Sequence, residues 1–202
     1  MPVKSVIAFI AALLLLAAGG YYYCFYPPAL LARATQRALD ELSQSVATKD
    51  RVHIGEAFQA LLTDRAHIRL EVSFFTPLQQ GGKPVIQEFD KPAFMAFIDN
   101  ILYSLQDYST RNTLQEFSLS TDKQTAHVVF TLHSWGDGLS YYGGISVNVR
   151  FNAETVCDGD VAFEGKRALL GGATCKIEIA TTPKPGEESK LHNPETIREL
   201  FR

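Results

Sequence analysis

A long stretch near the amino terminus is uncharged, with no charged residue between Lys4 and Arg33. Its apolar part, Ser5 to Tyr26, has 22 residues. At a rise of about 1.5 Å per residue, a helix of that length covers about 33 Å, and the hydrocarbon core of a bilayer is about 30 Å thick. The segment closes on the aromatic-rich run Tyr21 to Tyr26, which is typical of a membrane interface. The sequence therefore predicts a segment that can span a membrane.

A cleaved secretory signal is the main alternative for this segment. Lys4 would supply its positive end, and Ala17-Ala18-Gly19 would supply the small residues of a cleavage site. However, the apolar character continues for seven residues past Gly19, which favours an anchor that stays attached. A lipid attached at Cys24 is disfavoured, because Tyr21 to Tyr23 stand where such a site needs small residues.

These features together predict a single-pass inner-membrane protein. We expect residues 1–28 to form the transmembrane anchor and residues 5–26 to contact the membrane. The segment before the apolar run is short and positively charged at Lys4, so we expect the amino terminus to stay inside. The domain that follows would then face the periplasm.

The composition of the whole chain is that of a protein with one ordinary folded domain. Of the 202 residues, 46% are apolar and 20% are charged, and the formal net charge is −3. This length suits a single domain with appendages and is too short for a complete TIM barrel. The mildly acidic balance argues against nucleic-acid binding, which needs a basic surface.

Cys157 and Cys175 are the only cysteines outside the anchor. An exported domain meets an oxidising compartment, so we expect these two to form a disulfide. Closing the loop between these two positions stabilises the fold by about 3 kcal/mol in the chain-entropy model. The alternative is a pair of buried free thiols in a cytosolic domain.

Two kinds of hydrophobic spacing follow the anchor. Helical spacing occurs over residues 29–47, in a segment that Asp50 caps, and in a third segment that begins at Asp90. Strand-like alternation of apolar and polar residues occurs over residues 68–74, 84–89, 113–120, 125–135, 145–155 and 173–181. Strands with one apolar and one polar face predict an antiparallel sheet that the helices cover on one side. The expected fold class is α+β, with an amino-terminal transmembrane helix and then a curved antiparallel sheet packed on three helices.

The domain boundaries follow from changes in composition. We expect the folded domain to cover residues 29–181. Residues 182–202 begin as a polar linker rich in proline and end in a short helix that starts near Asn193. That helix either docks on the domain or binds a partner.

The order of the predicted elements resembles the NTF2-like superfamily, also called SnoaL-like or cystatin-like. The resemblance is carried by the helix DRVHIGEAFQALLTD before the strand IRLEVSFF, by the capped helix FDKPAFMAFIDNIL, and by the long late strands. It implies a cone in which a curved sheet wraps around helices and often leaves a pocket. The superfamily includes isomerases, dehydratases and hydrolases as well as membrane-tethered assembly domains, so the resemblance does not choose an activity.

Few polar groups are expected inside such a cone. The alternation places Gln115, Ser134 and Tyr141 on the apolar face of the strands, and helices or loops could add His53, Asp64 and Tyr103. These six are the candidate pocket residues, because acid–base chemistry needs a positioned carboxylate, histidine or tyrosine. No motif of the enzyme families is matched, so no catalytic residue is assigned.

Two glycine-containing segments are candidate sites. Trp135-Gly136-Asp137-Gly138 is interpreted as a turn between strands, with Trp135 and Tyr142 as candidate rim residues for a ligand or protein. Asp158-Gly159-Asp160 is interpreted as a plain turn, because the spacing of a calcium loop is missing. We expect no metal and no cofactor.

The sequence favours a non-catalytic, membrane-tethered binding or assembly domain of the cell envelope, with a protein partner there. The alternative is an enzyme or carrier that binds a small molecule in the pocket of the cone. A deep pocket with two convergent titratable groups would favour the alternative, and a cone filled by Phe and Leu would count against it. A tethered domain that forms a homodimer through its sheet is a third hypothesis.

Overall fold

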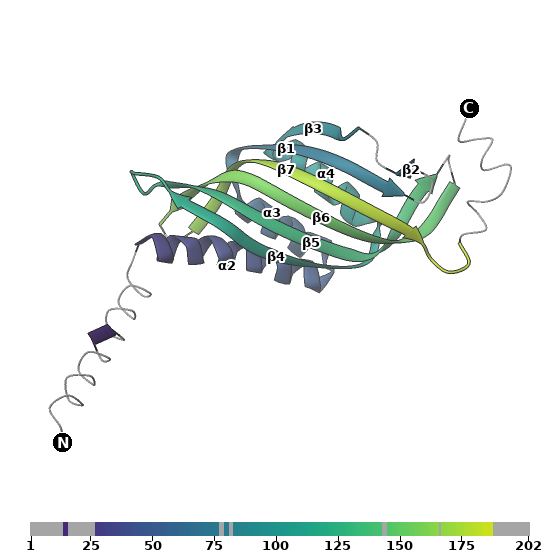
Figure 1. Ribbon diagram of the computed structural model, residues 1–202, viewed down its shortest axis with the longest axis horizontal. Helices are drawn as coiled ribbons and strands as arrows, with labels where there is room; N and C mark the ends of the chain where they lie inside the picture. Colours follow the sequence, from purple (N-terminus) through teal and green to yellow (C-terminus); the bar gives the residue numbers. More distant parts are fainter. Residues whose placement is uncertain are drawn as a thin grey trace, which may run out of the picture.

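The computed structural model describes residues 14–15, 27–76, 79–80, 83–142, 145–165 and 167–187 (Figure 1). Most of the predicted anchor, residues 1–28, lies outside these described residues, as does the predicted helix that starts near Asn193. Within the described part of the chain, no helix has both the length and the apolar character needed to cross a membrane. The membrane anchor stays a prediction.

The helices of the described residues are α2 (Pro27–Thr48), α3 (Arg51–Leu61) and α4 (Lys91–Ser104). Asp50 caps α3, because its carboxylate accepts a hydrogen bond from the N–H of Val52 at 3.0 Å. Asp90 caps α4 in the same way, accepting from the N–H of Ala93 at 2.9 Å. Such side chains satisfy the N–H groups that a first helical turn leaves without partners. The predicted starts of both helices are confirmed.

The strands of the described residues form a single curved sheet in the order β2-β1-β7-β6-β5-β4, and β3 also pairs with β1. Their bounds are β1 (Leu62–Thr76), β2 (Gln79–Gln80), β3 (Val85–Asp90), β4 (Leu105–Leu119), β5 (Thr125–Tyr142), β6 (Ile145–Glu164) and β7 (Arg167–Pro183). Figure 1 shows α2, α3 and α4 against one face of this sheet. The predicted α+β class, with helices on one side of a curved sheet, is confirmed.

One strand pair corrects the prediction of a wholly antiparallel sheet, because β1 and β7 are parallel. Leu70 pairs with Cys175, and Val72 pairs with Ile177. The other strand pairs recorded for the described residues are antiparallel. Side chains alternate with the same period in parallel and antiparallel strands. The alternation of apolar and polar residues therefore indicates which face of a strand is buried, but not the direction in which its neighbour runs. The long connection from β1 to β7 allows the last strand to return beside the first.

Strands β5 and β6 are longer than predicted, because the glycine-containing segments that predict turns lie inside them. Gly136-Asp137-Gly138 lies within β5, and Asp158-Gly159-Asp160 lies within β6. At Gly136 the neighbouring strand β4 approaches closely, so that an added Cβ would lie 2.0 Å from the carbonyl oxygen of Asp107. Glycine serves here for the close approach of two backbones.

The edge strand β4 is held to α2 by a buried amide. Asn112, only 9% exposed, donates from Nδ2 to the carbonyl oxygen of Leu39 at 2.7 Å and to the hydroxyl of Ser43 at 2.6 Å. Gln36 donates to the Oδ1 atom of Asn112 at 2.7 Å and accepts from the N–H of Leu114. A buried amide is costly unless its donors and acceptor find partners, and all find partners here. The long helix α2 therefore covers an edge that would otherwise be open to pairing.

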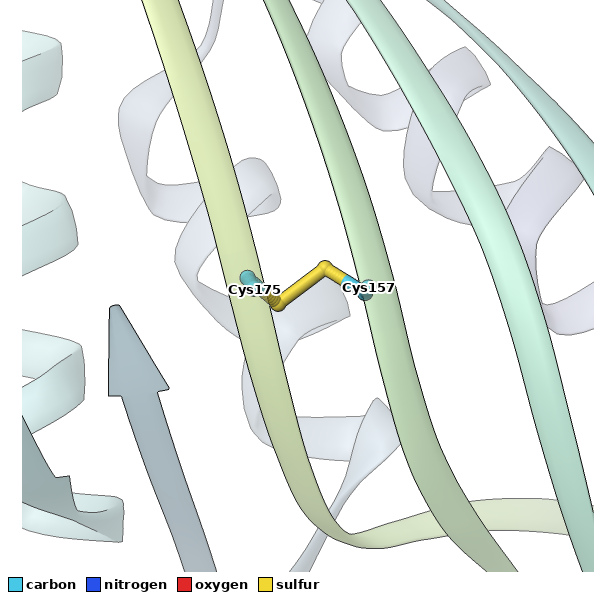
Figure 2. The surroundings of a disulfide bond; sticks show 2 residues. All are labelled: Cys157 and Cys175. Carbon is cyan, nitrogen blue, oxygen red and sulfur yellow. A yellow bond between two sulfur atoms is a disulfide. The ribbon is translucent and has the colours of Figure 1, made fainter. Parts of the chain in front are cut away.

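The disulfide predicted from the cysteine count joins the last two strands. Cys157 on β6 lies directly opposite Cys175 on β7, and the two form a disulfide (Figure 2). Both side chains are buried in the apolar layer between the sheet and the helices. The bond therefore lies in the core and not at the surface.

Candidate functional site

The described space between the helices and the sheet is filled by apolar side chains. Neighbouring rings among Phe58, Phe89, Phe94 and Phe97 have centroids 4.9 to 6.4 Å apart. They belong to the same cluster as the buried residues of the strands. The cavity between α2 and the sheet measures about 10 Å³, which is about the least that one water molecule needs. This cavity between α2 and the sheet is therefore too small for a substrate.

The candidate pocket residues from the helices and their junctions lie on the surface. His53 is exposed on α3, with its Nδ1 atom 3.9 Å from the carboxylate of Glu56. Asp64 lies at the start of β1 and is fully exposed, with Lys91 as its partner at 3.2 Å. Tyr103, at the end of α4, is 78% exposed.

The candidate pocket residues from the strands are held by neighbouring side chains. The amide of Gln115 donates to the hydroxyl of Thr131 at 2.6 Å. The hydroxyl of Ser134 hydrogen-bonds with that of Thr110 at 3.1 Å. Tyr141 and Tyr142 lie at the end of β5, and their side chains lie outside the described part of the structure. No hydrogen bond or ion pair recorded among the described residues joins any two of the six candidates.

A depression of about 420 Å³ lies on the face of the sheet that points away from the helices. The strand register builds it from one row, Asp107, Asp137, Arg150 and Thr182, and a second row, Ser109, Trp135, Asn152 and Ala180. Within each strand the two row positions are two residues apart, so their side chains share a face. Trp135, a candidate rim residue, is 47% exposed there. We call this depression the outer-face groove.

Opposite charges line one side of the outer-face groove. Asp107 and Asp137 are directly opposite on β4 and β5. The ammonium group of Lys184 lies 2.8 Å from the carboxylate of Asp137, and the Nε atom of Arg150 lies 3.8 Å from it. Lys49 forms an ion pair with Asp107. A hydrogen bond from Lys49 and its positive charge lower the pKa of Asp107, and the charge of Lys184 adds to this. Each of the two adjacent carboxylates therefore has a cationic partner.

Replacing Lys49 with methionine is expected to raise the pKa of Asp107 toward the ordinary value, because the hydrogen bond and the charge are lost together. The side-chain carboxyl carbon of Asp107, followed by NMR during an acid titration of the full chain, measures this. Asp122, in the turn between β4 and β5, is the control, because the hydroxyl of Ser120 and the N–H of Gln124 lower its pKa and Lys49 does not. An Asp107 titration identical to that of the wild type would contradict the assigned cause.

A second cavity, of about 250 Å³, lies at the end of the helix layer. It is lined by Lys49, Arg51, Leu102, Tyr103, Leu105, Gln106 and Tyr108. These residues come from the turn between α2 and α3, the end of α4 and the start of β4. The ion pair between Lys49 and Asp107 connects this cavity to the outer-face groove. We call it the end cavity.

Tyr108 is the least ordinary residue of the end cavity. Its side chain is 6% exposed, and its hydroxyl has no hydrogen-bond partner among the described residues. Burial raises the pKa of Tyr108, while the positive charges of Arg51 and Lys49 oppose that rise. Both cations line the same cavity as Tyr108. The guanidinium carbon of Arg51 lies 5.1 Å from the ring centre of Tyr103. The sequence alone indicates a role for neither Arg51 nor Tyr108. The spacing around Tyr108 is that of an ordinary aromatic residue in a strand, and only the folded structure shows which residues surround it.

The comparisons with known proteins give no family for the chain. No family model matches it, and no curated protein matches it. Solved structures share parts of the arrangement. A scytalone dehydratase-like protein from Novosphingobium aromaticivorans is 11% identical, with a TM-score of 0.48 over 75% of this chain and 86% of its own. LinA is 12% identical to this chain, with a TM-score of 0.45, and the match covers 79% of this chain and 95% of LinA.

A third similar structure is a cystatin-like domain of unknown function from Nostoc punctiforme. It is 11% identical, with a TM-score of 0.41 over 84% of this chain and 91% of its own. Other similar structures are described as NTF-2 like and ketosteroid isomerase-like. Similarities this weak establish neither a family nor an activity for this chain.

Proposed function

We propose that the chain is a non-catalytic binding or assembly domain of the cell envelope. Residues 5–26 would tether it to the inner membrane, with the folded domain on the periplasmic side. The observation that carries the non-catalytic part is the filled interior, in which Phe58, Phe94 and their neighbours occupy the space that a substrate would need. The observation that motivates the tether is the uncharged apolar run that precedes Arg33.

The distribution of titratable groups supports the same proposal. An acid–base enzyme brings at least two such groups to one site. Here His53 and Asp64 are exposed and have separate partners, Glu56 and Lys91. On the outer face of the sheet, the ion pair between Lys49 and Asp107 is open to solvent and the pair between Lys184 and Asp137 is partly buried. Charge pairs of this kind contribute to the specificity of an interface.

The outer-face groove is the surface on which we would expect a protein partner. Trp135 presents about half of its side chain there, and tryptophan is enriched among residues that dominate interface energies. Charged side chains of both signs surround it, as in the polar rim of an interface.

The tether is tested by fractionating cells that express the full chain. We expect the protein to stay in the membrane pellet after carbonate extraction, and a variant carrying both Leu14→Arg and Leu15→Arg to be lost from it, because charges at the centre of a span are costly. A reporter that is active only in the periplasm, fused after Arg202, should be active. Release of the wild-type chain by carbonate would refute the tether, and an inactive reporter would refute the topology.

The binding role is tested by photo-crosslinking in the native host. A photoreactive residue replaces Trp135 in one full-length variant and Gln59, an exposed residue of α3, in the matched control. We expect a discrete adduct with an envelope protein at position 135 and none at position 59. Equal, diffuse labelling at both positions would contradict a partner surface at the outer-face groove.

A further inference from the structure

The end cavity contains hydrogen-bond donors that the rest of the described structure leaves without acceptors. The hydroxyl of Tyr108 is buried and has no partner there. Arg51 has no carboxylate within 4 Å among the described residues, and its recorded contact is with the ring of Tyr103. A buried polar group without a partner is expensive, so a native structure that keeps one needs a reason such as a ligand or an ordered water.

The charges around the cavity define what could supply the missing acceptors. Lys49 is occupied by its ion pair with Asp107, which leaves Arg51 as the unneutralised cation among the described lining residues. One free positive charge is complementary to one negative charge. A guanidinium group also offers parallel N–H donors that match the two oxygens of a carboxylate.

The size and walls of the cavity limit the body of the ligand. A volume of about 250 Å³ lies below the range typical of drug-sized ligands. Leu102, Leu105 and the ring of Tyr103 provide apolar surface, and Gln106 adds one amide. The exposed lining is mostly polar, so the ligand needs a short body that contacts only Leu105 and the ring of Tyr103.

We propose that the end cavity binds a small organic monocarboxylate, with one carboxylate oxygen facing the guanidinium group of Arg51 and the other accepting the hydroxyl hydrogen of Tyr108. The site adjoins the outer-face groove, which Tyr108 also lines, and it goes beyond the proposed binding role of the domain. The raised pKa of Tyr108 supports the assignment, since the hydroxyl keeps its proton and acts as a donor.

The binding test uses the full chain in neutral detergent with acetate, butyrate and benzoate as probes. Each acid is titrated beside its neutral amide, and binding is followed by ligand-observed NMR. We expect at least one acid to bind tenfold or more tightly than its amide, because only the acid matches Arg51. Equal affinity for all three acids and their amides, or no binding of any acid, would overturn the proposal.

Two variants assign the contacts. Tyr108→Phe removes only the unpaired hydroxyl, so we expect the affinity for the acid to fall at least fivefold while the melting temperature stays the same or rises. Arg51→Gln should weaken binding at least tenfold. Arg167→Gln, an exposed arginine at the start of β7, is the matched control and should bind as the wild type does.

The Tyr108→Phe result separates a ligand site from a site that holds only water. If an ordered water satisfies the hydroxyl, the phenylalanine variant loses melting temperature and binds the acid as well as the wild type does. That outcome would overturn the proposal. It would leave the envelope role of the domain untouched, because the crosslinking test uses position 135.

Discussion

Gly136→Ala is expected to lower the free energy of unfolding by about 3 kcal/mol, the upper end of the usual cost of overpacking. The new Cβ would lie 2.0 Å from the carbonyl oxygen of Asp107 and 2.6 Å from the Cα atom of Tyr108. Both are backbone atoms of β4, so the clash is relieved only by moving the strand. That movement would break pairing between β4 and β5 around Asp107 and Asp137. Urea unfolding of the full chain, followed by circular dichroism, measures the change.

Gly55→Ala is the matched control for this prediction. Gly55 lies inside α3, and an added Cβ would meet no atom within 4 Å. Alanine is favoured over glycine in a helix interior, so this variant should be more stable by up to about 1 kcal/mol. Replacing glycine with alanine would then lower the free energy of unfolding at position 136 and raise it at position 55. A Gly136→Ala variant as stable as the wild type would show that β4 and β5 are not held so closely.

Replacing both Cys157 and Cys175 with alanine is expected to cost about 3 kcal/mol of unfolding free energy, since the loop that the bond closes is no longer restricted in the unfolded chain. The two residues are directly opposite on β6 and β7, so the bond crosses the ladder at the centre of the apolar face. Urea unfolding of the oxidised wild type and of the double variant, in neutral detergent, measures the difference.

A reductant provides the control for the disulfide. It should destabilise the wild type and leave the double variant unchanged, because the variant has no bond to lose. Non-reducing mass mapping of the protein from its native host should find the two cysteines joined. Two free thiols in that sample would remove the chemical support for an exported domain.

The helices could be predicted well because their signals are local. Asp50 and Asp90 act on N–H groups two and three residues further along, so a short window of sequence contains the whole cause. The alternation of apolar and polar residues likewise identified the buried face of the sheet. It failed where glycine lies within a strand, because Gly136 is explained by the backbone of Asp107, which is far away in sequence.

The sites depend on pairings that local patterns do not contain. The rows of the outer-face groove exist only because Asp107, Asp137 and Arg150 occupy matching positions on three strands. Trp135 could be singled out from its unusual residue type, but its charged neighbours could not. Arg51 and Tyr108 line one cavity because the start of α3, the end of α4 and the start of β4 come together there, which no periodicity predicts.

The parallel pairing of β1 with β7 also sets an order of events during synthesis. Leu70 on β1 can pair with Cys175 on β7 only after the ribosome has synthesised about a hundred further residues. Until then the two strands cannot form the central pair of the sheet. Contacts this distant in sequence slow folding, since much of the chain must be restricted before they form. We therefore expect the ribosome to finish β7 before any stable domain exists. A nascent chain that ends before Arg167 should remain sensitive to protease and open to chaperones.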